Sequence, residues 1–595
     1  MPKPARATWI DPSADPLTRY NAYKATARAH AESKKTEKTR LSHSRAFCVA
    51  IIVSYWEALC ARHGTTMQVR PVPLHTPQLT VDAQRTAAET GTLIADFPVE
   101  DAGYLIGSIY TVMLPSALRS QMGAYYTPPP LVSRLLDLAE LAGFDFENGT
   151  VIDPACGGGA FLAPVALRMM QRAKGASPKW TFRRISRRLK GIEIDPFAAW
   201  MTRVLLEAAL MPLCIAAKSR LPDLVTVADA LQSTELNAYD LVIGNPPYGR
   251  VTLDDTARSH YARSLYGHAN LYGLFTDLAM RLANSEGVVA YLTPTSFLGG
   301  QYFKALRHLL TSEMTPVAFD FVADREGVFD DVLQETLLTA FTRKQHKKAP
   351  IVSMIIPRGL NAAQIDQIGH VAVTRSGSPW LLPRTEADAS FLKTIASMPT
   401  RLSDLGYTVS TGPLVWNRHK PQLRTEATDD TLPIIWAESI TVRGFRFTSD
   451  RRNHVPFIAV QPDQPHLVTR TSCVLVQRTT SKEQSRRLLA TVLPQQFLDK
   501  MRGAVVENHV NMIVPPALEL AQVGPETIDA LINTKAVDRA FRCISGSVAV
   551  SAYELNALPL PTVKQLVALE KLIGTGASKQ EIERIVAGYY GTIVS

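Results

Sequence analysis

A short proline-rich segment, Asn245-Pro246-Pro247-Tyr248, directly follows an apolar run with the character of a β-strand. Proline stops a strand and stiffens the turn after it. The carbonyl of Pro246 and the side-chain carbonyl of Asn245 place two hydrogen-bond acceptors side by side. Tyr248 adds an aromatic face that can hold a planar ring. A rigid surface turn is the alternative, but the segment is typical of a site that binds an aromatic NH₂ group.

An aromatic amine is a weak nucleophile because its lone pair is delocalised into the ring. Hydrogen bonds to Asn245 and Pro246 would shift the nitrogen towards tetrahedral geometry and orient that lone pair. Attack on a carbon that is already activated, such as the methyl group of a sulfonium, then requires no carboxylic acid with a raised pKa. Positioning and charge stabilisation would therefore account for the rate.

Three further motifs follow apolar runs upstream. A glycine-rich loop spans residues 153–161, Glu193 ends the next run, and Asp229 ends the third. Glycines allow a backbone to approach a ligand, and acids at strand ends can accept hydrogen bonds from ribose and adenine groups. A dinucleotide-binding fold has similar features. The order of loop, acid and acid before the Asn-Pro-Pro-Tyr segment favours a nucleoside-containing cofactor beside the amine site.

The elements that position these motifs alternate between short aliphatic runs and amphipathic stretches from about residue 123 to residue 343. This alternation predicts βαβ units with a parallel sheet. Residues 1–100 predict a mostly helical region, and residues after about 350 predict a mixed α+β region. At 595 residues the chain is too long for one core, so we expect two or three domains.

The composition indicates an ordinary globular protein with a basic surplus. The formal net charge of +10 favours a polyanionic partner. None of the six cysteines forms a C-x-x-C pair, which predicts neither a metal site nor a disulfide framework. No apolar run approaches the ~20 residues of a membrane span, and the N-terminus lacks the apolar stretch of a signal peptide. We therefore expect a cytoplasmic protein with no membrane partner.

Taken together, the stretches DPACGGGAF, GIEIDP, VAD and NPPY resemble the amino-type DNA methyltransferases, in particular the N6-adenine enzymes of restriction–modification systems. Residues 123–129 resemble the G-x-Y/F-Y/F-T-P motif of that family. The order of the motifs is similar to the gamma class, and stretches within residues 475–542 resemble the recognition domains of type II enzymes of the BsuBI/PstI kind. The resemblance implies a helical N-terminal region (1–115), a catalytic domain (116–346) and a DNA target-recognition domain (347–595).

The resemblance also implies the fold, the cofactor and the site residues. The fold would be α/β, a Rossmann-like S-adenosylmethionine-dependent methyltransferase domain, with no metal. Asn245, Pro246, Pro247 and Tyr248 would be catalytic, and Phe329 would stack on the flipped-out base opposite Tyr248. Asp229 is followed by alanine where some members have a phenylalanine beside the cofactor adenine. The residues expected to bind the cofactor are Tyr126, Thr127, Asp153, Ala155, Gly157, Phe161, Glu193, Ile194, Asp229, Ala230 and Asn245.

Double-stranded DNA is the partner that the resemblance implies, with a separate restriction endonuclease in the same system. Arg478, Asn508 and His509 are our candidates for DNA binding, because arginine pairs with guanine edges and asparagine with adenine edges. Arg486 and Arg487 are further candidates. Nine basic residues between positions 168 and 190 could contact phosphate, but we interpret that stretch as the solvated face of a crossover helix.

The expected activity is methylation of adenine N6 in double-stranded DNA at a specific site. Methylation of cytosine N4, or of an amine on RNA or protein, uses the same pair of acceptors and stays open. A binding protein with an inactive centre is a third class, against which the intact Asn-Pro-Pro-Tyr segment argues. We find no convincing nuclease motif in the chain.

Overall fold

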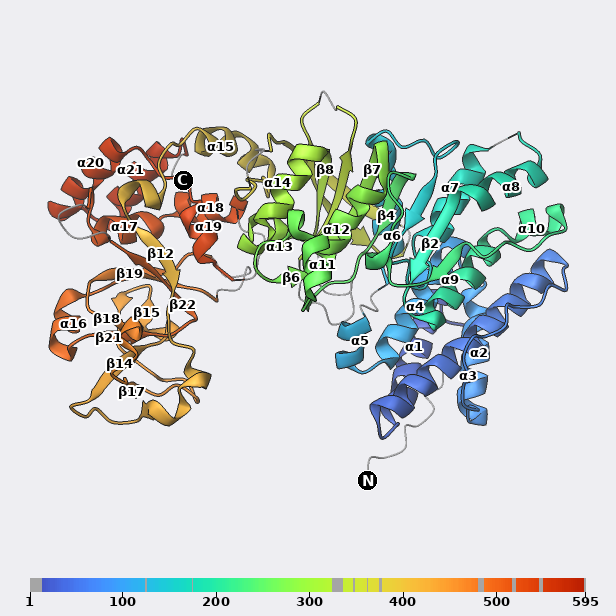
Figure 1. The fold of residues 1–595 in the computed structure, drawn as a ribbon, viewed down its shortest axis with the longest axis horizontal. Helices are drawn as coiled ribbons and strands as arrows, with labels where there is room; N and C mark the ends of the chain where they lie inside the picture. The colour runs from blue at the N-terminus through green and yellow to red at the C-terminus, as the bar shows by residue number, and fades with distance from the viewer. Residues whose placement is uncertain are drawn as a thin grey trace. The chain divides into compact units, whose positions relative to one another are not determined.

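The computed structural model describes residues 13–122, 126–173, 175–323, 335–345, 348–360, 362–373, 377–479, 486–515, 521–544 and 549–592. The chain divides into two compact units (Figure 1). The first comprises Met1–Pro294 and Leu309–Gln367, and the second comprises Thr295–His308 and Ile368–Ser595. A boundary at 346/347 is therefore wrong for the folded chain. Strand β10 (Ile351–Arg358) still pairs with β8 (Thr315–Val322) of the first unit.

Helices form the N-terminal part of the first unit: α1 (Pro16–Glu32), α2 (Glu37–His63), α3 (Val81–Ile94), α4 (Ala102–Met113) and α5 (Ser116–Met122). Within the described residues, α2 alone among single helices has the length and apolar composition of a membrane span, and 61% of its apolar window is buried inside the protein. Its buried side, with Phe47, Ile51 and Trp56, belongs to a core shared with the other helices. The helix therefore has the apolar composition that a central bundle helix needs.

A nine-stranded sheet forms the centre of the first unit, in the order β11-β10-β8-β9-β7-β4-β1-β2-β3. Strand β9 is antiparallel to both β7 and β8, whereas β4, β1, β2 and β3 are parallel. The sheet is thus mixed: the expectation of parallel strands holds for β7, β4, β1, β2 and β3 and fails at β9. The remaining bounds are β1 (Val151–Asp153), β2 (Leu189–Glu193), β3 (Val225–Val227), β4 (Tyr239–Gly244), β7 (Ala283–Pro294), β9 (Thr336–Thr342) and β11 (Ala362–His370).

Crossover helices cover this sheet and bury one continuous core. Leu135, Val165 and Leu206 from three of these helices share that core with Ile243 and Leu292 of the strands. Because parallel strands end at the same edge, the loops after β1, β2, β3 and β4 meet there. The helices are α6 (Pro129–Leu141), α7 (Leu162–Arg172), α8 (Pro178–Arg188), α9 (Pro196–Ala209), α10 (Met211–Ala217), α11 (Asp255–His260), α12 (Leu271–Leu282) and α14 (Lys304–Glu313).

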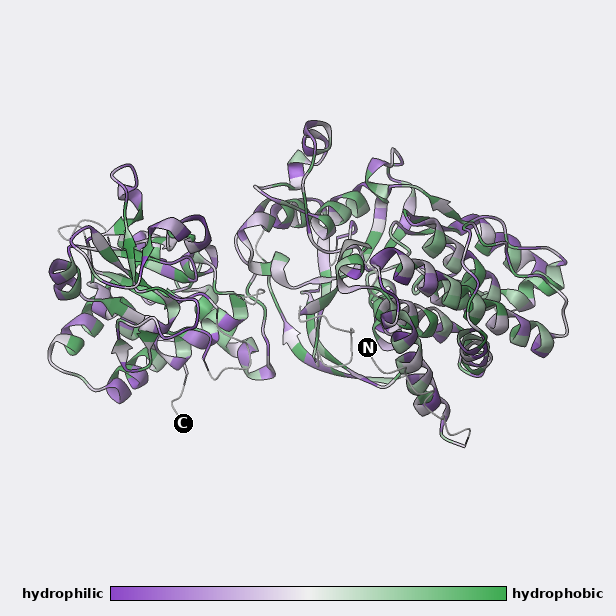
Figure 2. Cartoon of the chain, turned by 90° about the horizontal axis from the view of Figure 1, so that it is seen from below, coloured by the Kyte–Doolittle hydropathy of each residue, from purple (hydrophilic) through white to green (hydrophobic). Residues whose placement is uncertain are grey.

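The second unit is the mixed α+β structure that the sequence predicts. An antiparallel sheet runs β12 (Thr408–Thr411), β22 (Val510–Val514), β19 (Cys473–Gln477), β20 (Ala490–Leu493). A second sheet contains β13 (Leu423–Arg424), β17 (Phe457–Ala459), β14 (Thr431–Ile435), β21 (Ala504–Val506) and β18 (Val468–Thr469), beside a β15–β16 hairpin (Ile440–Thr441, Gly444–Phe445). Several strands of this unit carry the hydrophobic colour in Figure 2. Its helices are α13 (Ser296–Gly299), α15 (Glu386–Ala396), α16 (Gln495–Met501), α17 (Pro525–Ile532), α18 (Lys535–Ile544), α19 (Ala552–Asn556), α20 (Val563–Gly574) and α21 (Lys579–Tyr589).

Replacing Gly91 with alanine tests the close packing of α2 on α3. The added Cβ would lie 2.2 Å from the carbonyl oxygen of Ile51, so the two helices must separate. We expect a loss of about 1–3 kcal/mol in the free energy of unfolding, measured by denaturant titration. Gly574→Ala is the matched control because its Cβ would meet no atom within 4 Å. Equal stability of the two variants would contradict this packing.

Candidate active site

A cavity of about 1130 Å³ opens where the loops after β1, β2, β3 and β4 meet. Small-molecule pockets typically measure ~300–1,000 Å³, so this one lies just above the usual range. Of the eleven residues expected to bind a cofactor, ten line it: Tyr126, Thr127, Ala155, Gly157, Phe161, Glu193, Ile194, Asp229, Ala230 and Asn245. The exception is Asp153.

The glycine-rich loop after β1 needs each of its three glycines. Gly157 and Gly159 have φ of +52° and +85°, which side chains with a Cβ rarely adopt. Gly158 is required by contact instead, because a Cβ there would lie 2.3 Å from the ring of Tyr126. A Cβ on Gly107 of α4 would meet the same ring at 2.1 Å. Tyr126 therefore fits between the loop and the N-terminal helices, and its position depends on both.

Glu193 at the end of β2 connects two loops of the cavity. Its carboxylate accepts hydrogen bonds from the backbone N–H of Gly157 at 2.9 Å and of Asp195 at 2.8 Å. Burial raises the pKa of Glu193, and these backbone hydrogen bonds oppose that rise. Each carboxylate oxygen has a further lone pair. The residue can therefore accept hydrogen bonds from the two hydroxyls of a ribose.

The cavity wall near Asp229 is suited to a flat apolar ring with a polar edge. Ile194 and Leu236 line it although their side chains are 67% and 60% exposed, an unusual position for aliphatic groups. Asp229 accepts from the backbone N–H of Leu231 at 3.0 Å and keeps acceptor capacity for an amino group. Leu236, which no motif singles out, adds apolar surface to the same cavity.

Asp153 lies beneath the glycine-rich loop rather than on the cavity wall. Its Oδ1 accepts from the backbone N–H of Ala155 at 3.0 Å, and its Oδ2 is buried with no hydrogen-bond partner. Burial raises the pKa of Asp153 to about 8. Gly244 makes room for it, since a Cβ there would lie 2.7 Å from Oδ1. Its position therefore supports the loop, and direct contact with a cofactor stays a prediction.

The N-terminal helices contribute to the cavity in a way that no sequence motif indicated. Arg45 of α2 donates from Nη2 to both carboxylate oxygens of Asp195, at 3.1 and 3.2 Å. Asp195 in turn caps α9 by accepting from the N–H of Phe197 at 3.1 Å. Tyr110 of α4 lines the cavity directly. The helical region is therefore part of the site, and its role could not be read from local sequence.

The Asn-Pro-Pro-Tyr segment follows β4 at the cavity, with Asn245 and Pro247 on its wall. Asn245 donates from Nδ2 to the buried hydroxyl of Thr127 at 3.2 Å, which fixes the orientation of its amide. Its Oδ1 accepts from the Tyr248 hydroxyl at 2.7 Å. Tyr248 packs edge-on against Tyr272 with ring centroids 6.1 Å apart. Neither Pro246, which is buried, nor Tyr248 is among the residues that line the cavity.

The DNA-binding candidates of the second unit lie side by side. Arg478 donates from its backbone N–H to the carbonyl of His509 and from Nη1 to that of Asn508, each at 3.0 Å. His509 is 58% exposed and is held through Nδ1 by the buried carboxylate of Glu507 at 2.9 Å. Arg487 is 1% exposed, so the prediction that it contacts DNA is wrong. The expected stacking residue, Phe329, lies outside the described residues.

Comparisons with known proteins place this geometry in context. Residues 188–329 match the family model described as the Eco57I restriction-modification methylase. The Type II methyltransferase M.PstI of Providencia stuartii is 25% identical over 357 residues, which cover 58% of this chain and 70% of that protein. M.TthHB8I of Thermus thermophilus, another Type II methyltransferase, is 30% identical and covers 33% of this chain and 41% of its own length.

Among solved structures, the Type IIL restriction-modification enzyme MmeI, solved in complex with DNA, aligns with 98% of this chain and 92% of that chain. Its TM-score is 0.50 and its identity is 15%, which shows a shared fold. The expected fold class is confirmed. The similarity to methyltransferases and the acceptors at the strand ends together identify S-adenosylmethionine as the cofactor.

Asp153→Asn tests the buried carboxyl beneath the loop. Asparagine keeps an oxygen for the Ala155 N–H but cannot ionise. Because the folded-state pKa of about 8 lies above the ordinary 3.8, the carboxyl lowers stability progressively as pH rises between these values. We expect the melting temperature of the variant, relative to the unaltered protein, to increase over this range and to level off above it. A difference that does not change with pH would contradict the buried, protonated carboxyl.

Arg45→Ala tests the contribution of the N-terminal helices. It leaves the partly buried carboxylate of Asp195 without its cation, next to the loop that Glu193 holds. We expect S-adenosylmethionine to bind about tenfold more weakly, or ~1.4 kcal/mol, by titration calorimetry. Arg85→Ala is the control, since its ion pair with Asp82 is exposed. Unchanged binding by a folded Arg45→Ala protein would show that the ion pair does not position the loop.

Proposed function

We propose that this chain, which carries an Eco57I-like methylase region, is a site-specific DNA methyltransferase that methylates N6 of a flipped-out adenine in double-stranded DNA. It would be the modification half of a restriction–modification system, with cleavage by a separate endonuclease. The similarity to Type II methyltransferases supports methyl transfer. The observation that supports an amine as the group that receives the methyl is the oriented amide of Asn245 on the cavity wall.

The orientation of Asn245 explains how the amine would be held. Thr127 engages Nδ2, so Oδ1 is the atom offered to a donor, and the Tyr248 hydroxyl satisfies it in this structure. An N–H of the target amine would take the place of that hydroxyl, while the Pro246 carbonyl accepts the second N–H. When bound, S-adenosylmethionine supplies a methyl group on a positively charged sulfur. Asn245 and Pro246 then hold the nitrogen lone pair in position.

The size of the cavity supports a base that leaves its duplex. A base that stays stacked cannot enter a pocket at the strand ends, and extrusion costs a few kcal/mol. Contacts from the second unit would offset that cost and select the sequence. Arg478, Asn508 and His509 are our candidates there, since they lie together and offer both phosphate- and base-binding groups.

Expression in cells that lack adenine methylation, followed by single-molecule sequencing of genomic DNA, tests this function. We expect N6-methyladenine at one short motif, and its loss in Asn245→Ala, which removes the acceptor. Asn21→Ala, at an exposed position of α1, is a matched control for the substitution. Methylcytosine instead would change only the base. Methylation of neither base by a protein that binds S-adenosylmethionine would exclude DNA and direct attention to RNA or protein amines.

A further inference from the structure

The basic stretch between β1 and β2 separates into two groups in the structure. Members of the first group have hydrogen-bond or ion-pair partners within the first unit. Their partners are acidic side chains or the carbonyls that precede β1: Arg168 with Asp137, Arg172 with Glu140, Lys190 with Glu235, and Arg184 and Arg188 with the carbonyl of Glu147. For these residues the interpretation as ordinary surface groups is sufficient.

The second group lies on the outer side of α8. Lys179, Arg183 and Arg187 are exposed and follow one another at intervals of four residues, so they form one line along the helix. This line extends over ~12 Å at 1.5 Å per residue. Within the described part of the chain, none of the three makes an ion pair or a side-chain hydrogen bond, and α8 itself contains no acidic residue.

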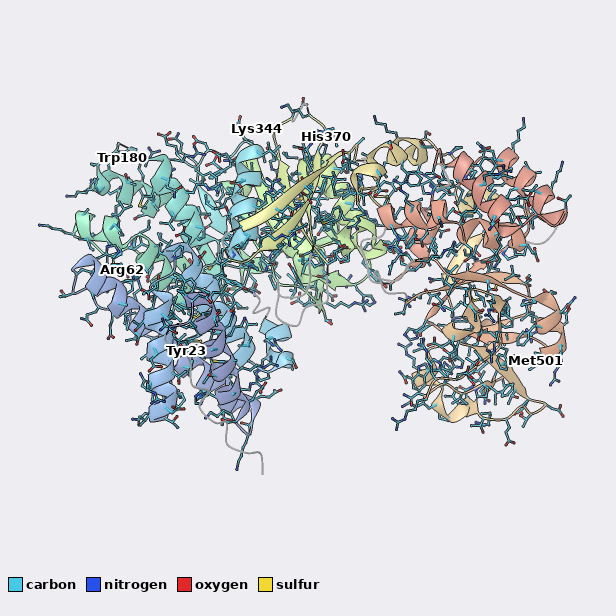
Figure 3. All side chains as sticks on the ribbon, turned by 180° about the vertical axis from the view of Figure 1, so that it is seen from behind. Tyr23, Arg62, Trp180, Lys344, His370 and Met501 are labelled. Atoms are coloured by element: carbon cyan, nitrogen blue, oxygen red, sulfur yellow. The ribbon has the colours of Figure 1, made fainter. Side chains whose placement is uncertain are left out.

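An exposed aromatic side chain lies beside this line of charge. Trp180 is 44% exposed, and the guanidinium of Arg184 lies 4.2 Å from the centroid of its ring. In Figure 3 it lies at the outer margin of the helices. An exposed indole beside cations offers a partner both an aromatic ring and charge. We call Lys179, Trp180, Arg183 and Arg187 the α8 face.

The α8 face lies at the edge of the sheet opposite the cavity. Arg188, at the end of α8, donates to the carbonyls of Glu147 and Gly149, which precede β1. The cavity lies where β1 ends, beyond Asp153. Figure 1 shows α8 beside α7 and α10, away from α11, which follows the Asn-Pro-Pro-Tyr segment. The α8 face and the cavity therefore lie at different edges of the sheet.

We propose that the α8 face binds the phosphate backbone of a second segment of duplex DNA, separate from the segment that holds the target base. Over ~12 Å of axis a duplex carries about seven charges, at one per ~1.7 Å, which is more than enough to neutralise three cations. The choice of DNA rests on the proposed function. The surface itself would suit any regular polyanion, so an acidic lipid surface is the competing occupant and an outcome of the test. A second DNA contact would keep the enzyme on long DNA between target sites.

The test compares two doubly substituted full-length proteins, Arg183→Gln/Arg187→Gln and the control Lys35→Gln/Lys38→Gln. Both pairs are exposed on helices or beside them, and both changes remove two charges. Binding of a long duplex is measured by fluorescence anisotropy over a series of salt concentrations. We expect the slope of log K against log salt to become about 2 units less steep in the α8 variant and to stay unchanged in the control. Binding of S-adenosylmethionine should be the same in both.

Equal slopes for the two variants would overturn the proposal. The proposal would also be overturned if the α8 variant lost binding to phosphatidylserine vesicles but kept its binding to DNA, because the occupant of the α8 face would then be a lipid surface. This readout is independent of methylation. If the unaltered protein binds duplex through α8 but methylates no base, the proposed function fails and the surface stands. If methylation occurs and the two variants have equal slopes, the proposed DNA contact at α8 is wrong and the proposed function stands.

Discussion

The cofactor cavity depends on the hydrogen bonds that one carboxylate, that of Glu193, accepts from two loops. It accepts the backbone N–H groups of Gly157 and Asp195, and so joins the loop after β1 to the loop after β2. Both loops would otherwise carry unpaired backbone donors at the base of a cavity. Because the same oxygens keep free lone pairs, the residue that shapes the two loops can also bind a ribose.

The N-terminal helices complete the cavity that these two loops form. A cavity at the strand ends needs a wall on its outer side, and α4 supplies it through Tyr110 and through Gly107, against which Tyr126 packs. Arg45 fixes the second loop from α2 through Asp195. The helical region is therefore better described as one side of the cofactor site than as an extension of the catalytic domain, in agreement with its inclusion in the first unit.

Both ends of the Asn245 amide have hydrogen-bond partners in this structure. Thr127 accepts from Nδ2 and the Tyr248 hydroxyl donates to Oδ1. A buried polar group left unpaired would cost about 1–3 kcal/mol. Exchange of one donor for another avoids that cost, and a planar amine with two N–H groups can make the exchange while a hydrocarbon ring cannot.

The sequence by itself determined the features that depend on chain neighbours. Gly157 and Gly159 adopt conformations that favour glycine. Glu193 ends a strand, and Asp229 and Asn245 follow strands, and the apolar runs of these strands can be recognised in the sequence. It failed where distance in space differs from distance in sequence. The tertiary structure alone decided that Asp153 lies under the loop, that β9 runs antiparallel, and that Arg487 is buried. Arg45 and Asp195 are 150 residues apart, and only helix packing brings their charges together.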